Sequence, residues 1–215
     1  MLISKLTSQK TKFDEEMKNK LIENQEMIIN YCFAKSNKRQ LTNVQEEILN
    51  AIKTLNYQQF IDMGGRNQID LNFKTKDSIG GKDVESPLLC AVIKGCPKML
   101  KLVIGNKSVD INERYGPCII GDKGVNVFWI ACSMGNAKMM WHLAEAGIDV
   151  LCTNYRGTNA LHLAVLKGFS YIVKMLLKSN FPLKNITKDC FNALHICATT
   201  GNVKIMDMFV DHLKN

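Results

Sequence analysis

The sequence contains few residues that could carry out chemistry, and its four histidines are the first to consider. They are His142, His162, His195 and His212. His162 and His195 occupy the same position in two matching segments of the sequence. If these segments form helices that pack side by side, the two histidines lie about 10 Å apart. A zinc ion binds histidine nitrogens at about 2 Å, so these two side chains could not share one ion. We expect structural roles for them, and we expect no bound metal and no cofactor.

Neither the cysteines nor the glycine-rich segments form a catalytic pattern. The eight cysteines make no CxxC pair and no zinc-ligand spacing, and several fall on apolar helix faces, where cysteine packs as a small hydrophobic residue. The GxSxG, HExxH and GxxxxGK[ST] motifs do not occur. The glycines in 80–81 and 121–124 do not lead from a strand into a helix with phosphate-loop spacing. The sequence therefore predicts that the chain is not an enzyme.

The net charge of +8 would favour an acidic protein, an anionic lipid surface or nucleic acid. The basic residues are scattered, with a small patch at Lys35, Lys38 and Arg39, and we attribute the charge mainly to solvation. No run of aromatic and cationic residues suggests a nucleic-acid platform. The apolar run 127–132 is too short to span a bilayer, and no secretory signal is recognised. We expect a cytoplasmic protein with reduced cysteines and a protein partner, whose acidic character the net charge would favour, and we do not expect nucleic acid as the partner.

A pattern repeated along the sequence predicts the secondary-structure elements that carry the histidines. The segment 159–164 (Asn-Ala-Leu-His-Leu-Ala) matches 192–197 (Asn-Ala-Leu-His-Ile-Cys) at an offset of 33 residues. One step earlier stands 126–131, and before it 86–91, whose offset is longer because seven extra residues intervene. A repeat of this kind indicates a stack of similar units.

The repeat length and its residues resemble the ankyrin family, whose signature is Thr-Pro-Leu-His-x-Ala. Ser86-Pro87-Leu88 keeps the proline, and 160–162 and 193–195 keep the Leu-His pair. Asparagine replaces threonine in three repeats, which suits a helix N-cap equally well. The resemblance covers roughly residues 45–215. It implies an all-α solenoid of stacked helix-turn-helix units with hairpin loops, in which His162 and His195 bond backbone groups of their own and the neighbouring loop.

The repeat divides the chain into six predicted segments. Asn159 should cap an inner helix that ends near Lys167, with Gly168 in the left-handed turn, whereas Leu55 takes that glycine position in the first, degenerate unit. The N-terminal extension carries an amphipathic pattern, either for an extra helix packed on the stack or for a partner or membrane surface. The predicted segments are an N-terminal helical extension (1–41), a capping repeat (42–77), a repeat with a long loop (78–123), two further repeats (124–156 and 157–189) and a C-terminal repeat (190–215).

The resemblance implies a non-enzymatic adaptor or scaffold that binds another protein through loop tips and the concave face of the inner helices. Two insertions, 73–84 and 113–124, lengthen the loops on one face, which is often the binding face. A regulatory segment of a larger enzyme or channel, and a structural subunit of a large assembly, remain as alternatives. The candidate partner-binding residues are Tyr115, Ile119, Ile120, Lys123, Val125, Met134, Tyr155, Arg156, Thr158, Leu166, Lys167, Lys188 and Phe191.

The last helix keeps an interior pattern where a terminal repeat normally becomes polar. Its apolar positions are Ile205, Met206, Phe209, Val210 and Leu213. We expect this end to be covered, either by further residues of a longer chain or by another subunit. The alternative is a helix that ends here and tolerates an exposed apolar patch.

Overall fold

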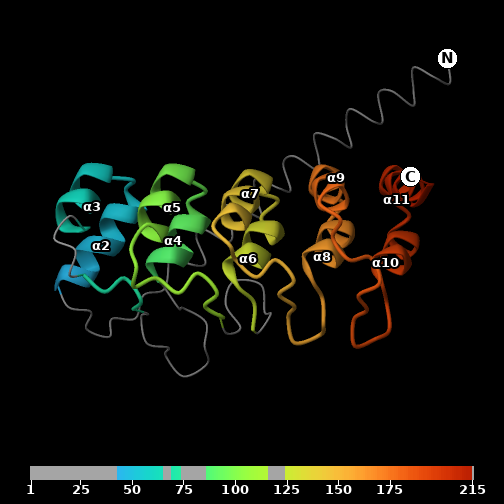
Figure 1. Ribbon diagram of the computed structural model, residues 1–215, viewed down its shortest axis with the longest axis horizontal. Helices are drawn as coiled ribbons and strands as arrows, with labels where there is room; N and C mark the ends of the chain where they lie inside the picture. The colour runs from blue at the N-terminus through green and yellow to red at the C-terminus, as the bar shows by residue number, and fades with distance from the viewer. Residues whose placement is uncertain (1–42, 65–68, 74–85, 116–123, 215) are drawn as a thin grey trace, which may run out of the picture.

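The computed structural model describes residues 43–64, 69–73, 86–115 and 124–214, and in these ranges it contains ten helices and no strand. The helices stand in two rows, with the loops extending from the side of the inner row (Figure 1). The inner row consists of α2 (Asn43–Lys53), α4 (Pro87–Ile93), α6 (Val127–Ser133), α8 (Ala160–Leu166) and α10 (Ala193–Thr200). The outer row consists of α3 (Tyr57–Gly64), α5 (Pro97–Ile104), α7 (Ala137–Glu145), α9 (Ser170–Lys178) and α11 (Val203–Lys214).

Each of the five predicted repeat units contains one inner and one outer helix, and the predicted all-α fold of stacked helix pairs is confirmed. The predicted N-terminal extension at 1–41 lies outside the described residues. Helices of seven or eight residues are unstable alone in water. They are held here by neighbours, because α6 packs between α4 and α8, and α8 packs between α6 and α10. One continuous apolar core runs from Ile48 to Phe209.

The inner helices begin at side chains that accept from their own first turn. Asn126 accepts from the backbone N–H of Trp129, and Asn159 and Asn192 accept in the same way from His162 and His195. Ser86 does the same for α4, with Pro87 at the first helical position. The predicted N-caps at Asn159 and Asn192 are therefore present, and an oxygen on a short side chain is what the position requires.

The turn between inner and outer helix requires a left-handed backbone, which is why glycine recurs there. Gly168 has φ 73°, so it adopts the left-handed conformation that was predicted for it. In the first unit Leu55 adopts φ 54° at the equivalent position. A side chain in this conformation is strained by roughly 1–2 kcal/mol, so the degenerate first unit keeps the turn at a cost in stability.

Candidate functional site

Two neighbouring hairpin tips, 155–157 and 186–188, are joined directly to each other. The backbone N–H of Lys188 donates to the carbonyl oxygen of Arg156 at 2.8 Å. At Gly157, which has φ 77°, a Cβ atom would lie 3.4 Å from both the Lys188 nitrogen and the Thr187 Cα. The left-handed backbone at Gly157 favours glycine, and the hydrogen bond between the tips joins them into one surface rather than two separate loops.

Each tip is also closed internally by a polar side chain at its start. The Asn154 side-chain oxygen accepts from the backbone N–H groups of Arg156 and Thr158, at 3.0 and 2.8 Å. One repeat later the Thr187 hydroxyl accepts from the N–H of Phe191 at 3.2 Å. Turns closed by side-chain acceptors lose little further freedom on binding. The tips are thus fixed in the unbound protein.

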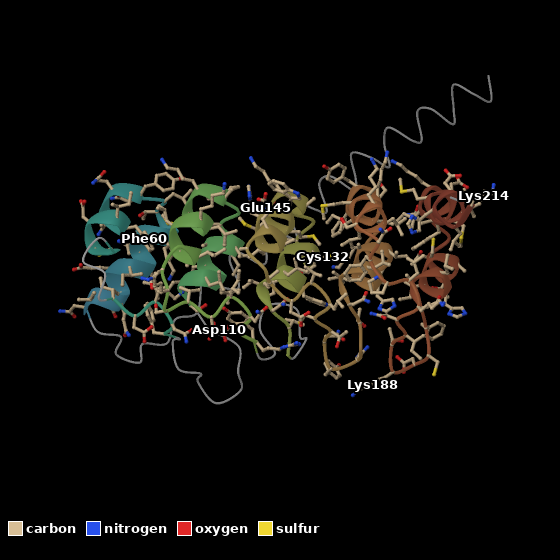
Figure 2. The ribbon with its side chains drawn as sticks, viewed as in Figure 1. Phe60, Asp110, Cys132, Glu145, Lys188 and Lys214 are labelled. Carbon is tan, nitrogen blue, oxygen red and sulfur yellow. The ribbon has the colours of Figure 1, made fainter. Side chains whose placement is uncertain are left out.

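The tips present aromatic and cationic side chains to solvent. Tyr155 is 46% exposed, and the Arg156 Nε donates to its hydroxyl at 2.8 Å. Phe191 is 44% exposed and packs edge-on against the His195 ring, with centroids 6.0 Å apart. Figure 2 shows Lys188 at the end of its hairpin loop, away from the outer helices. Tyrosine, arginine and phenylalanine are residue types enriched at protein interfaces.

The two signature histidines occupy equivalent positions but different surroundings. His162 is buried; its Nδ1 accepts from the Asn159 N–H at 3.3 Å, and its Nε2 lies 3.0 Å from the carbonyl oxygen of Asn185 in the next loop. This pattern fits a neutral ring with the proton on Nε2. Burial lowers the pKa of His162, and the Asn185 carbonyl opposes that shift in part.

His195 makes only the first of these bonds, accepting from the Asn192 N–H at 3.2 Å, and its ring is exposed beside Phe191. The predicted bonding of a signature histidine to its own and the neighbouring loop is therefore confirmed for His162. At His195 the structure shows only the bond within its own repeat. His195 is a surface residue that was missed, and its side chain adjoins the predicted site.

Three candidate residues are buried, so predicting them as part of a partner surface was wrong. Tyr115 and Val125 are 1% exposed and Met134 is 4% exposed. The Tyr115 hydroxyl lies 2.7 Å from a Glu113 carboxylate oxygen and 2.9 Å from the Ser86 hydroxyl. Tyr115 and Val125 also form a backbone bridge that closes the base of the second insertion. Met134 folds inward at the end of α6, where the equivalent residue of the next repeat is Lys167.

The other candidates divide by exposure. Tyr155, Arg156, Leu166, Lys188 and Phe191 are exposed, and Thr158 and Lys167 are half-buried. Ile119, Ile120 and Lys123 lie outside the described residues. The structure thus brings Tyr155 and Arg156 together with Lys188 at the joined tips, and it places Leu166 at the end of inner helix α8.

Within the ranges described here, no group of three or more His, Cys, Asp or Glu side chains could hold a metal ion. The described cysteines carry free thiols, and four of them are buried. None of the described helices has the length and apolar character needed to cross a membrane. The surface of the hairpin tips can therefore contribute to binding through its shape, its aromatic side chains and its positive charge.

The comparison with known families rests on the same repeats. The family model for ankyrin repeats (three copies) matches residues 88–187 and 128–215. This chain belongs to the ankyrin-repeat family. Ankyrin repeats are typically non-enzymatic modules that bind other proteins.

One relative of this ankyrin-repeat protein is the E3 ubiquitin-protein ligase KEG of Arabidopsis thaliana. The two are 25% identical over 132 residues, which is 60% of this chain and 8% of the ligase. The match with the ankyrin-repeat chain thus covers only a small part of the much longer ligase.

Proposed function

We propose that this ankyrin-repeat protein is a non-enzymatic adaptor or scaffold that binds another protein through its hairpin tips and the concave inner-helix face. The observation that carries the proposal is the hydrogen bond from the Lys188 N–H to the Arg156 carbonyl, which joins two exposed tips into one surface. A surface fixed before binding loses little entropy when the partner arrives. Stacked repeats supply that rigidity over a length set by the number of units.

The chemistry of the tips favours a partner with both apolar and acidic side chains. Tyr155 and Phe191 offer ring area, and Leu166 extends the apolar surface onto the concave side of α8. Arg156 and Lys188 add positive charge at the tips. Acidic groups on the partner would meet these cations, which favours correct orientation and fast association.

The test is capture of a partner from cell extract with the intact 215-residue chain, followed by affinity measurements on variants. Tyr155→Ala and Phe191→Ala should each weaken the captured partner by about tenfold, since aromatic anchors carry much of the binding energy of interfaces. Leu166→Ala and Ile61→Ala form a matched pair, because both remove an exposed aliphatic side chain, one from the concave face and one from outer helix α3. Only Leu166→Ala should weaken binding.

Unchanged affinity in Tyr155→Ala, Phe191→Ala and Leu166→Ala alike would reject the tips and concave face as the binding site. Melting curves of each variant should stay close to that of the parent chain, because exposed side chains contribute little to folding. A variant that melts early would be replaced by Tyr155→Ser or Phe191→Ser.

A second candidate is that the array is the partner-binding segment of a longer enzyme or channel. The observation that favours it is the ligase relative, of which the matched part is 8%. An antibody raised against the array distinguishes the two readings. A native polypeptide near 24.2 kDa would favour the adaptor, and a much larger one would favour the segment.

A third candidate is a structural subunit whose C-terminal end face is covered. Leu177 is buried in α9, whereas Val210 at the equivalent position of α11 is exposed, as is Leu213. Ile205 and Phe209 are already buried within the stack, so only part of the predicted apolar pattern is exposed. Light scattering tests this, because self-association that is lost in the Val210→Lys, Leu213→Lys double variant would show that the face is normally covered.

A further inference from the structure

The outer helices carry a concentration of positive charge that is not evident from the order of the sequence. Within α5, α7 and α9 the acidic residue is Glu145, whereas lysines recur along all three helices. The inner helices α4, α6 and α8 contain no Lys, Arg, Asp or Glu. Among the helices of these three repeats, the positive charge therefore lies on the outer row, which is on the side opposite the loops (Figure 1).

The repeat brings these lysines into register with two aromatic residues. Lys138 precedes Tyr171, and Trp141 precedes Lys174, by one repeat of 33 residues. Residues three apart lie on the same side of a helix, and neighbouring helices pack about 10 Å apart. Two parallel rows result, and all their side chains are exposed. This outer-helix patch consists of Lys98, Lys101, Lys138, Trp141, Tyr171 and Lys174.

The two aromatic residues stand out because the stack does not need them. Trp141 is 53% and Tyr171 72% exposed, whereas their apolar neighbours Met139 and Ile172 are buried in the core. A large ring in water gains little unless it packs on a partner. On the same face the Lys98 Nζ lies 4.3 Å from the centroid of the Tyr57 ring, so lysine and aromatic groups already combine here.

The charges of the lysines in the patch are available to a partner. Across the described part of the chain, none of them forms an ion pair with Asp or Glu. Glu145 lies at the register of Lys178, outside the two rows. At the far end Asp207 of α11 takes the position that Lys174 has in α9. The row of Lys101, Trp141 and Lys174 therefore ends at α9, whereas the exposed Lys204 of α11 continues the row of Lys98, Lys138 and Tyr171.

We propose that the outer-helix patch binds an extended, acidic polypeptide segment, independently of the hairpin tips. An extended chain in the polyproline II conformation has three residues per turn and rises about 3.1 Å per residue. Every third side chain therefore returns to the same side about 9 Å further along, close to the helix spacing of about 10 Å in the stack. Carboxylates at that interval meet the lysines of successive repeats. An apolar side chain between them packs on the rings of Trp141 and Tyr171.

Two other polyanionic partners fit the patch less well. A membrane surface is bound by helices with a broad apolar face, and here the large apolar side chains of α7 and α9 are buried, with the exception of Trp141, Tyr171 and half-buried Met175. Nucleic acid is usually contacted through arginine as well as lysine, and the patch contains no arginine. Both partners are outcomes of the experiment below.

The probe is a synthetic dodecapeptide of Glu-Glu-Leu triplets, added to the full chain and followed by tryptophan fluorescence. The chain has two tryptophans, and Trp129 is fully buried, so a change in emission or acrylamide quenching reports Trp141. Binding should shift the Trp141 emission to shorter wavelength and weaken as salt is added. A dodecapeptide of Lys-Lys-Leu triplets should leave the emission unchanged.

Two double charge reversals separate this patch from the hairpin tips. Lys138→Glu with Lys174→Glu should weaken peptide binding by about tenfold or more, because attraction becomes repulsion at two positions. Lys184→Glu with Lys188→Glu makes the same change of net charge on the loops and should alter binding by less than about twofold. Tyr171→Ala should weaken binding by about fivefold without changing the net charge.

The proposal is overturned if the acidic peptide leaves Trp141 emission unchanged, or if both double variants weaken binding equally. It is also overturned if oligothymidylate or phosphatidylserine vesicles bind more tightly than the peptide, which would assign the patch to nucleic acid or to a membrane. None of these results bears on the hairpin tips, whose role is decided by Tyr155→Ala and Phe191→Ala.

Discussion

The indole Nε1 of Trp129 donates a hydrogen bond to the carbonyl oxygen of Thr158, 3.0 Å away in the following repeat. Trp129 occupies the position that histidine takes in the next two repeats, and like His162 it bonds to the loop of its neighbour. Two chemically different rings thus perform the same task. In both cases a buried ring nitrogen satisfies a loop carbonyl and fixes the position of a hairpin tip.

Replacing Trp129 with phenylalanine should destabilise the protein. The change leaves the Thr158 carbonyl without its indole donor and removes part of a fully buried ring, at a cost of about 1–3 kcal/mol. Urea unfolding measures the loss. Trp141→Phe is the matched control, because the same substitution at an exposed residue should stay within about 0.5 kcal/mol; equal effects at both positions would refute the role given to Trp129.

Substitution of the signature histidines should affect stability unequally. His162→Ala removes bonds to Asn159 and Asn185, and His195→Ala removes only the bond to Asn192. The first should therefore cost about 1–3 kcal/mol more than the second. Denaturant unfolding of both variants checks this, and a zinc chelator should not change the helical circular dichroism of the parent chain. A loss of helix on chelation would contradict the structural role of these residues.

Acidification should destabilise the fold through His162. Burial lowers its pKa in the folded state below the ordinary value of 6.5, so the unfolded chain binds more protons as the pH falls below that value. The stabilisation is complete above pH 6.5 and is lost as the pH falls through the lowered folded pKa. Protonated Nδ1 also could not accept from the Asn159 N–H.

Unfolding free energies measured from pH 7.5 to 5 in the parent and in His162→Gln would test this effect. The variant should lose part of the pH dependence over this range, while other ionisable groups keep their own contribution. Identical profiles in the two proteins would show that His162 does not contribute. The pKa can also be read directly from the His162 ring resonances by NMR, and it should lie below that of the denatured chain.

Cys190→Gly should stabilise the protein. Cys190 is exposed and adopts φ 62° at the position that Gly157 holds one repeat earlier. Removing the side chain relieves the left-handed strain of roughly 1–2 kcal/mol, less about 0.5–1 kcal/mol for the greater freedom of glycine in the unfolded chain. Thermal melts should show a small rise in Tm, whereas the reciprocal Gly157→Ala should lower it, since a side chain at φ 77° is strained.

The regular parts of the fold were predictable because one local pattern recurs. Asn159 and Gly168 define the start and the end of an inner helix through backbone chemistry that neighbouring residues largely determine. Repetition at a constant interval then extends the interpretation from one unit to the others. The bond from His162 to the next loop followed from the family resemblance rather than from the residues alone.

The misassigned residues depend on contacts that no local pattern reveals. Tyr115 is buried because Ser86, 29 positions earlier, and Glu113 surround its hydroxyl. The insertion that follows Tyr115 interrupts the 33-residue spacing, so the sequence hides its correspondence with Asn154 and Thr187, which make the same backbone bond across their loops. The outer-helix patch was missed for a related reason, because residues such as Lys138 and Lys174 are scattered in the sequence and gather only when the repeats are stacked.

The bridge between Tyr115 and Val125 has a consequence for how such proteins diversify. The Tyr115 N–H donates to the carbonyl oxygen of Val125, and the Gly124 N–H donates to the carbonyl oxygen of Tyr115. These two hydrogen bonds fix the positions of both ends of the insertion. Any segment whose ends can join Tyr115 and Gly124 satisfies this requirement, whatever its length or composition. Evolution, or a protein engineer, can exchange the intervening residues for a new recognition loop while the neighbouring repeats keep their packing.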